Sequence, residues 1–305
     1  MRYRYFILTI TLTFLFSNSG GYAGSIYQYG SNARAIALSN SLVSNYNKGY
    51  NPLTNPALLG REAAKLEYGF SYFSMSLDRS IQPFSISIPV PPSASMGFSL
   101  FMTSVDDIQG ADASGNYTNS YNAWDGFGML SFGLDFSKLS AGLNIKILKS
   151  EIDVYGASGI GVDIGFLYRL SSRHQFAFLM NNLHAKYTWD IASLYEEKLP
   201  RILSFGGSSK IGESILSIYQ IDYSLKSKIL LCKIGVELDM FPLKNIPMDI
   251  RLGLNNNNDL LNPSFGFGYN ILMQNKLNLG IDYAIDLGME DEGISHLFTL
   301  TFNKR

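Results

Sequence analysis

The sequence predicts an all-β protein: a transmembrane antiparallel β-barrel of about 14 strands, with a short N-terminal segment that plugs the lumen. From about residue 66 to 302, apolar residues alternate with small or polar ones, and in a strand these two sets lie on opposite faces. Only 16% of the residues are charged, whereas 19 Tyr and 20 Phe supply side chains for aromatic girdles. No apolar run after residue 23 is long enough for a membrane-spanning helix. This combination is typical of a barrel with lipid outside and a polar lumen inside.

The first residues have the features of a secretory signal peptide, which we place at residues 1–23. Arg2 and Arg4 give a basic start, a short apolar core follows, and cleavage is expected after Ala23. Export followed by amphipathic strands predicts a bacterial outer-membrane protein with both termini in the periplasm. A soluble β-sandwich is the alternative, and the signal peptide and the regular two-sided pattern argue against it.

Residues 24–65 lack the alternation of the rest. Residues 32–43 are rich in Ala and Leu and predict a short helix, whereas residues 47–60 are rich in Asn, Gly and Pro and predict turns. Apolar side chains such as Ile36 and Leu38 need packing partners, so we expect this segment to plug the lumen. A disordered periplasmic tail is the alternative.

Residues 66–305 form the predicted barrel. We expect strands at 66–77, 80–89, 95–105, 124–136, 138–149, 158–171, 174–183, 199–211, 214–226, 229–241, 246–255, 263–273, 276–287 and 294–303. Their number is even, as a single-chain outer-membrane barrel requires. The connections expected in the periplasm are mostly short turns, and those expected outside the cell include the longer, polar loops.

The charged residues within the strands predict which face is inside. A charge on the lipid face near the midplane costs about 2–4 kcal/mol, so charges at the polar positions are expected in the lumen. These are Asp163, Arg169, Glu237, Asp249, Arg251, Asp282 and Asp286. We expect them to pair with one another and with the plug, and a selectivity filter is the alternative. Glycines at inward positions leave room for a plug or a bound chain.

Signals of catalysis, metal binding and nucleic-acid binding are weak. The glycine-rich stretch 156–161 is neither a Gly-x-Ser-x-Gly elbow nor a dinucleotide loop, because no helix pattern follows it. The three histidines lie far apart, without the spacing of metal ligands. The formal net charge of −1 gives no attraction to nucleic acid. We therefore expect a protein that is not an enzyme, with no cofactor, no metal and no nucleic-acid partner.

Several stretches resemble a known family. Residues 31–38, followed by Asn55-Pro56-Ala57-Leu58, resemble the start of mature PorV/PorQ-type outer-membrane proteins, which belong to the FadL-like barrel superfamily. Residues 155–165, 182–183, 199–200 and 281–284 are also similar, so the resemblance covers almost the whole mature chain. It implies a fourteen-stranded barrel whose N-terminal segment lies in the lumen. The residues of this chain that match the plug motif are Ala33, Arg34, Asn55, Pro56 and Ala57.

The resemblance implies two different functions. PorV looks like a carrier that receives secreted proteins from a translocon, whereas FadL-like members move long-chain hydrophobic molecules across the outer membrane. We favour protein secretion or surface assembly, with a secreted cargo protein or translocon subunits as partners. Transport of a hydrophobic small molecule is the alternative. In both cases outer-membrane lipids surround the barrel.

Each function points to different residues. A cargo carrier would bind its partner with outer loops, and the segment 187–195 places Tyr187, Trp189, Ile191 and Tyr195 in a nominally aqueous loop. The same loop could instead fold down onto the lumen. A transporter would need a greasy path, and Phe101 falls on an inward face. A sideways exit through the wall would also need a kinked strand.

Overall fold

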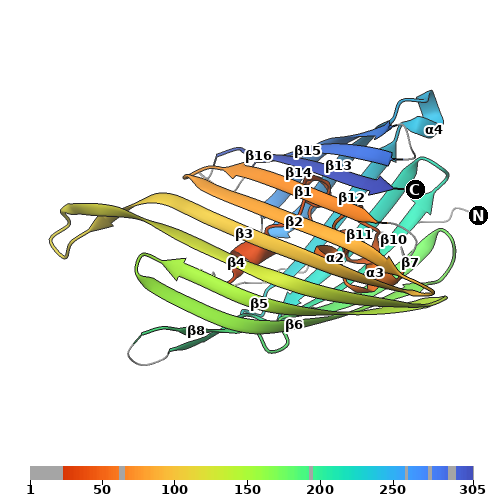
Figure 1. Cartoon of the computed structure of the whole chain (residues 1–305). Coiled ribbons are helices and arrows are strands. Elements are labelled where there is room, and N and C mark those ends of the chain that lie inside the picture. The colour runs from red at the N-terminus through yellow and green to blue at the C-terminus, as the bar shows by residue number, and fades with distance from the viewer. Residues whose placement is uncertain are drawn as a thin grey trace, which may run out of the picture.

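The computed structural model describes residues 23–61, 66–191, 195–257, 260–273, 277–287 and 293–304. Nearly all of the predicted signal peptide lies outside these ranges. The strands form one antiparallel sheet, which closes on itself because β5 pairs with β6 (Figure 1). The strands are β1 (Glu67–Met75), β2 (Arg79–Val90), β3 (Ala94–Ala111), β4 (Tyr117–Phe136), β5 (Leu139–Ile152), β6 (Tyr155–Arg169), β7 (His174–Asn181), β8 (Lys186–Trp189), β9 (Glu196–Lys198), β10 (Ile202–Ile211), β11 (Ile215–Ser224), β12 (Leu230–Asp239), β13 (Met248–Asn257), β14 (Leu260–Leu272), β15 (Leu277–Asp286) and β16 (Ser295–Lys304).

Fourteen of these strands form the closed ring, and β8 and β9 form a hairpin that pairs with one half of β6. The predicted all-β antiparallel barrel of about 14 strands is therefore confirmed. Each of the fourteen predicted strands corresponds to one strand of the ring, with bounds that differ by a few residues in most cases.

Two differences from the predicted strands have identifiable causes. Strands β3 and β4 continue into a region predicted as a loop, because register shifts after Val105 and Gln109 interrupt the alternation of the sequence. The β8–β9 hairpin was also predicted as a loop. Its strands are four and three residues long, too short for a period of two to be visible.

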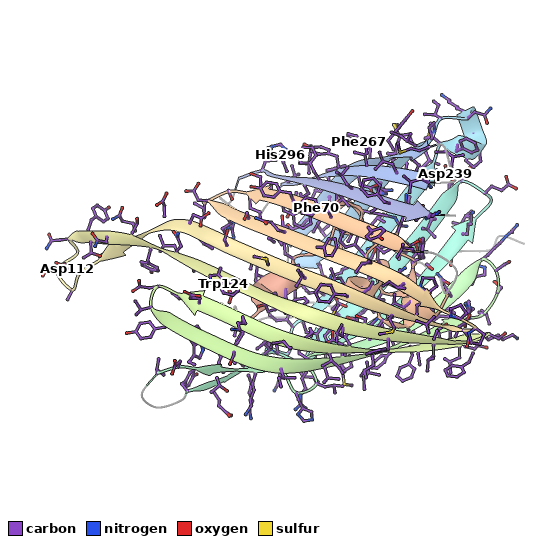
Figure 2. All side chains as sticks on the ribbon, viewed as in Figure 1. Phe70, Asp112, Trp124, Asp239, Phe267 and His296 are labelled. Carbon is purple, nitrogen blue, oxygen red and sulfur yellow. The ribbon has the colours of Figure 1, made fainter. Side chains whose placement is uncertain are left out.

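The two ends of the barrel differ. At one end, which we call the turn end, short connections at 91–93, 137–138 and 212–214 join neighbouring strands, and β16 finishes there. At the opposite end, which we call the loop end, the β3–β4 hairpin projects beyond the other strands, with Asp112 near its tip (Figure 2). This is the predicted asymmetry between short turns and longer loops.

The outer face of the ring is apolar and the inner face is polar. On β15, for example, Ile281 is exposed whereas its neighbour Asp282 is buried. Exposed apolar side chains recur on nearly every strand, among them Phe70 and Phe267 (Figure 2). An apolar surface of this extent is expected of a protein that contacts lipid. No helix in the described part of the chain is both long and apolar enough to cross a membrane.

Residues 23–61 lie inside the ring (Figure 1) and are called the N-terminal segment below. Its helices are η1 (Ser25–Gln28), α1 (Ala33–Ala37), η2 (Leu42–Ser44), α2 (Asn51–Thr54) and α3 (Ala57–Arg61); a fourth α-helix, α4 (Phe241–Lys244), lies between β12 and β13. Helix α1 packs against β13–β16, η2 against β7, β10 and β11, and α3 against β3–β6. The helix predicted over 32–43 is shorter, because Ser39 and Asn40 adopt positive φ angles.

Inward glycines let the N-terminal segment approach the barrel backbone. A Cβ added to Gly142 would lie 2.2 Å from the carbonyl carbon of Pro56, and one added to Gly165 would lie 2.0 Å from Oδ1 of Asn55. Both distances are far below van der Waals contact. The segment therefore packs directly on the barrel wall, and its apolar side chains, such as Leu38 and Leu58, are fully buried.

Candidate functional site

Two cavities lie inside the barrel. The inner-mouth cavity has a volume of about 340 Å³ and lies at the turn end, between the N-terminal segment and the ends of β7, β10, β12 and β13. The lumenal cavity, of about 170 Å³, lies nearer the loop end and is lined by the other side of the segment and by β3, β4, β7 and β10–β12. A smaller cavity of about 70 Å³ shares much of its lining with the lumenal cavity.

Beside the inner-mouth cavity lies an ionic cluster, which consists of Arg34, Glu237, Asp249, Arg251 and Asp282. Arg34 donates from Nε and Nη2 to both carboxylate oxygens of Glu237, at 2.8 and 3.0 Å. Arg251 donates to Glu237 at 2.6 Å, to Asp282 at 2.5 Å and to Asp249 at 3.1 Å. These bonds tie the N-terminal segment to β12, and through Arg251 to β13 and β15. Charge-assisted, two-point arginine contacts of this kind fix geometry strongly.

The other residues of the predicted plug motif also hold the N-terminal segment in place. The backbone N–H of Ala33 donates to Oγ1 of Thr299 on β16, at 2.8 Å. Asn55 accepts from the N–H of Ala57 at 3.0 Å and donates to the carbonyl of Val43 at 2.9 Å. Pro56 is the residue that packs on the Gly142 backbone. The motif therefore contributes bonds and close packing between the segment and the barrel.

The remaining predicted lumenal charges each have a partner. Asp163 forms an ion pair with Lys146 at 2.7 Å. Arg169 pairs with Asp135 near the turn end. Asp286 accepts a hydrogen bond from Tyr29 of the N-terminal segment, at 2.5 Å. This arrangement corresponds to the predicted internal pairing, since a selectivity filter would require a ring of like charges facing an open pore.

One wall of the lumenal cavity carries a ring cluster, formed by Tyr27, Phe101, Phe127 and Tyr187. Phe101 and Phe127 lie opposite each other on β3 and β4 and stack at 5.4 Å with an angle of 6°. The ring of Tyr27 is edge-on to both, at 5.6 and 5.0 Å. The hydroxyl of Tyr27 shares a hydrogen bond with that of Tyr187. These contacts combine stacked and edge-to-face pairs, both favourable for aromatic rings.

The predicted partner-binding loop does not form one outer surface. Tyr187 is 2% exposed and points into the lumen, whereas Tyr195 is 55% exposed. Trp189 is partly buried and donates from Nε1 to Glu197 at 3.2 Å, and Ile191 is partly exposed at the end of the hairpin. Residues 192–194 lie outside the described residues. The prediction is therefore corrected for Tyr187, which packs in the lumen because it pairs with Tyr27.

Sequence reasoning identified Phe101 as an inward residue but missed Tyr27 and Phe127. Phe127 shares its face with Asp125 and Met129, so pairing of the two predicted strands would have placed it opposite Phe101. No pattern marks Tyr27, because it lies in a segment without strand periodicity.

The opposite wall of the lumenal cavity is more polar. It includes Leu179 and Ile202, which are buried, together with Asp222 and Lys233. Nζ of Lys233 lies 2.6 Å from Oδ2 of Asp222. The cavity thus offers aromatic and aliphatic surface on one side and a single ion pair on the other. Such a combination of apolar lining and few polar groups is usual for small-molecule sites.

These features define a class: a closed antiparallel barrel with an apolar outer face and an N-terminal segment fixed in its lumen. No protein-family model matches the sequence, and a search of curated proteins finds no match. Among solved structures, the Pseudomonas putida toluene transporter TodX matches with a TM-score of 0.68 and 11% identity, over 91% of this chain and 99% of that one. This chain has the fold of the FadL-type barrels, of which TodX is one example.

Two further structures support the same fold. A monoaromatic hydrocarbon channel, CymD, matches with a TM-score of 0.62 and 11% identity, over 91% of this chain and 98% of that one. A Pseudomonas aeruginosa FadL homologue matches with a TM-score of 0.60 and 8% identity, over 90% and 98% of the two chains. At these identities the similarity concerns the fold alone. Assignment to the PorV/PorQ type stays a prediction.

Proposed function

We propose that this protein is a non-enzymatic outer-membrane channel that admits small hydrophobic molecules. The observation that carries the proposal is the lumenal cavity, whose ring cluster faces buried aliphatic side chains. An apolar solute that enters from the loop end would leave water and contact this surface, which favours binding. In this proposal the turn end faces the periplasm.

The size of the cavity supports a small substrate. An engineered apolar cavity of about 150 Å³ binds benzene, and the lumenal cavity has about 170 Å³. A single aromatic ring therefore fits, whereas a long acyl chain would need more room. The names of two structural neighbours, a toluene transporter and a monoaromatic hydrocarbon channel, agree with a substrate of this size.

The N-terminal segment separates the lumenal cavity from the turn end, so a substrate needs a second way out. We propose the wall beside β7 as that way. Residues 182–185 bulge between β7 and β8, and Asn182 adopts a φ of 61° there. The bulge is held by hydrogen bonds from Asn182 to Asp163 and to the carbonyl of Pro200, at 2.9 and 3.0 Å. Release of these few bonds would open a path toward lipid.

Protein secretion or surface assembly, the function favoured from the sequence, ranks second. Its predicted recognition residues are divided between the lumen and the outside, because Tyr187 is buried and Tyr195 is exposed. The fold matches also favour the channel, since two of them are with proteins named as hydrocarbon channels or transporters.

Uptake into vesicles tests the proposal. We would reconstitute the full-length mature protein and measure entry of toluene, comparing it with a Leu179→Trp variant that fills the lumenal cavity. The matched control is Phe267→Trp on the outer face. We expect Leu179→Trp to lower uptake about tenfold or more and the control to leave it unchanged. Equal uptake by both variants and by empty vesicles would reject the channel, and a stoichiometric secreted protein co-purifying from the native membrane would favour the carrier.

A further inference from the structure

The polar wall of the lumenal cavity contains a buried ion pair with an unusual hydrogen-bond count. The side chains of Lys233 and Asp222 are each 11% exposed, and both line the cavity. A buried ammonium is costly unless its donors have partners. The distribution of these donors therefore indicates whether the pair is purely structural.

The carboxylate side of the pair is fully occupied. Oδ2 of Asp222 faces Lys233, and Oδ1 accepts from Nε2 of Gln220 at 2.8 Å. Oε1 of Gln220 in turn accepts from the backbone N–H of Val43, at 2.9 Å. This chain fixes Asp222 against the N-terminal segment, so that the carboxylate cannot swing away to follow a ligand.

The ammonium side is not fully occupied. Lys233 carries three N–H donors, and Asp222 is the partner that the described residues give it. Lys146, on the other side of the lumen, provides the comparison. Its Nζ meets Asp163 at 2.7 Å, Oδ1 of Asn182 at 2.8 Å and the ring of Phe127 at 5.5 Å from the centroid. Lys146 is saturated by the protein, whereas Lys233 keeps donors that face the cavity.

We propose that the lumenal cavity binds a single-ring molecule that carries one neutral oxygen acceptor, a phenol in chemical class. Its ring packs on the ring cluster and on Leu179, and its oxygen accepts a hydrogen bond from Nζ of Lys233. A neutral oxygen suits the site better than a carboxylate, because Asp222 already balances the charge of Lys233. This inference rests on the channel function proposed above and names the substrate class of the same cavity.

The test compares p-cresol with toluene, which differ by one hydroxyl. A hydrogen bond to a charged group stabilises by about 1.5–3 kcal/mol, so we expect p-cresol to bind roughly tenfold tighter or more. Dissociation constants would be measured by calorimetry on the full-length mature protein in detergent. In Lys233→Met, which keeps the apolar stem, the ratio of the two constants should fall to near one. A Lys244→Met variant, exposed on α4, should keep the ratio of the parent protein.

The outcomes separate the two proposals. If neither compound binds the parent protein, the channel proposal fails. If toluene binds and p-cresol shows no advantage, or if Lys233→Met keeps the advantage, only the role of Lys233 is overturned. Should Lys233→Met fail to fold because Asp222 is left alone, the double variant Lys233→Met/Asp222→Asn keeps the bond from Gln220 and answers the same question.

Discussion

The ionic cluster and the ring cluster occupy the same lumen and solve different problems. The ionic cluster joins the N-terminal segment to the barrel, and each of its five charged side chains has a partner within the cluster. The ring cluster also contacts the segment, through Tyr27, but it borders a cavity rather than filling the space. Charges lie where the structure must not move, and rings lie where a solute can enter.

The difference has a physical reason. A buried charge requires several fixed partners, so a charged cluster leaves no freedom for ligand exchange. Apolar surface imposes no such directional demand, since its contacts are weak individually and can be exchanged for those of an apolar solute. The same lumen can therefore hold a plug firmly at one level and a small molecule loosely at another.

Removal of Arg251 should break the comparison most strongly. In Arg251→Met, Asp249 and Asp282 lose their guanidinium partner, and Glu237 retains only Arg34. Breaking a buried pair from one side costs about 3–5 kcal/mol. The free energy of unfolding in lipid vesicles should fall by that amount. A loss below about 1 kcal/mol, which is the range of an exposed pair, would mean that the cluster does not hold the segment.

Overpacking at Gly142 should have the next largest effect. An added methyl would overlap the backbone of Pro56, and overpacking costs about 1–3 kcal/mol. We expect Gly142→Ala to lower the unfolding free energy by that amount and to expose the N-terminal segment to added protease. Gly156→Ala is the matched control, because an added Cβ there has open space. Equal protease sensitivity of the two variants would argue against tight seating of the segment.

The ring cluster should respond more mildly. Tyr27→Phe keeps the edge-on ring and removes the hydroxyl that pairs with Tyr187. One intramolecular hydrogen bond contributes about 1 kcal/mol, so we expect a loss of that size in the unfolding free energy. A double-mutant cycle with Tyr187→Phe checks the reason, because the second substitution should add little after the first. Fully additive losses would show that the two hydroxyls act independently.

The smallest effect is expected at the rim. Lys186 on β8 pairs with Glu196 on β9, and both side chains are about half exposed, at 46% and 48%. Exposed ion pairs contribute about 0–1 kcal/mol. Lys186→Met should therefore leave the unfolding free energy nearly unchanged, and high salt should abolish what difference remains. A loss as large as that of Arg251→Met would contradict the contrast between rim and lumen.

Much of the barrel was predictable, because strand periodicity is a local property. Alternation over 276–287 alone places Ile281 outside and Asp282 inside, and both positions agree with the structure. The interruptions were not predictable. A register shift at Val105 and a positive φ at Asn182 each depend on how a neighbouring strand is paired, and that information lies elsewhere in the chain.

The candidate site was predictable only in part. The inward positions of Glu237 and Arg251 follow from the period of two. Their common partner Arg34 precedes Glu237 by 203 positions, and no local pattern connects the two. The ring cluster has the same origin, since Tyr27 reaches Phe127 and Tyr187 only after the N-terminal segment enters the barrel.

The sequence by itself determined the architecture: an all-β barrel of fourteen strands, with an apolar outside and a polar inside. These features depend on the alternation of side chains along each strand, which any short stretch of sequence displays. Only the tertiary structure decided where the cavities lie, which lysine is saturated and which keeps free donors toward the lumen. Those features depend on contacts between residues distant in the chain, and such contacts exist only when the ring has closed around the N-terminal segment.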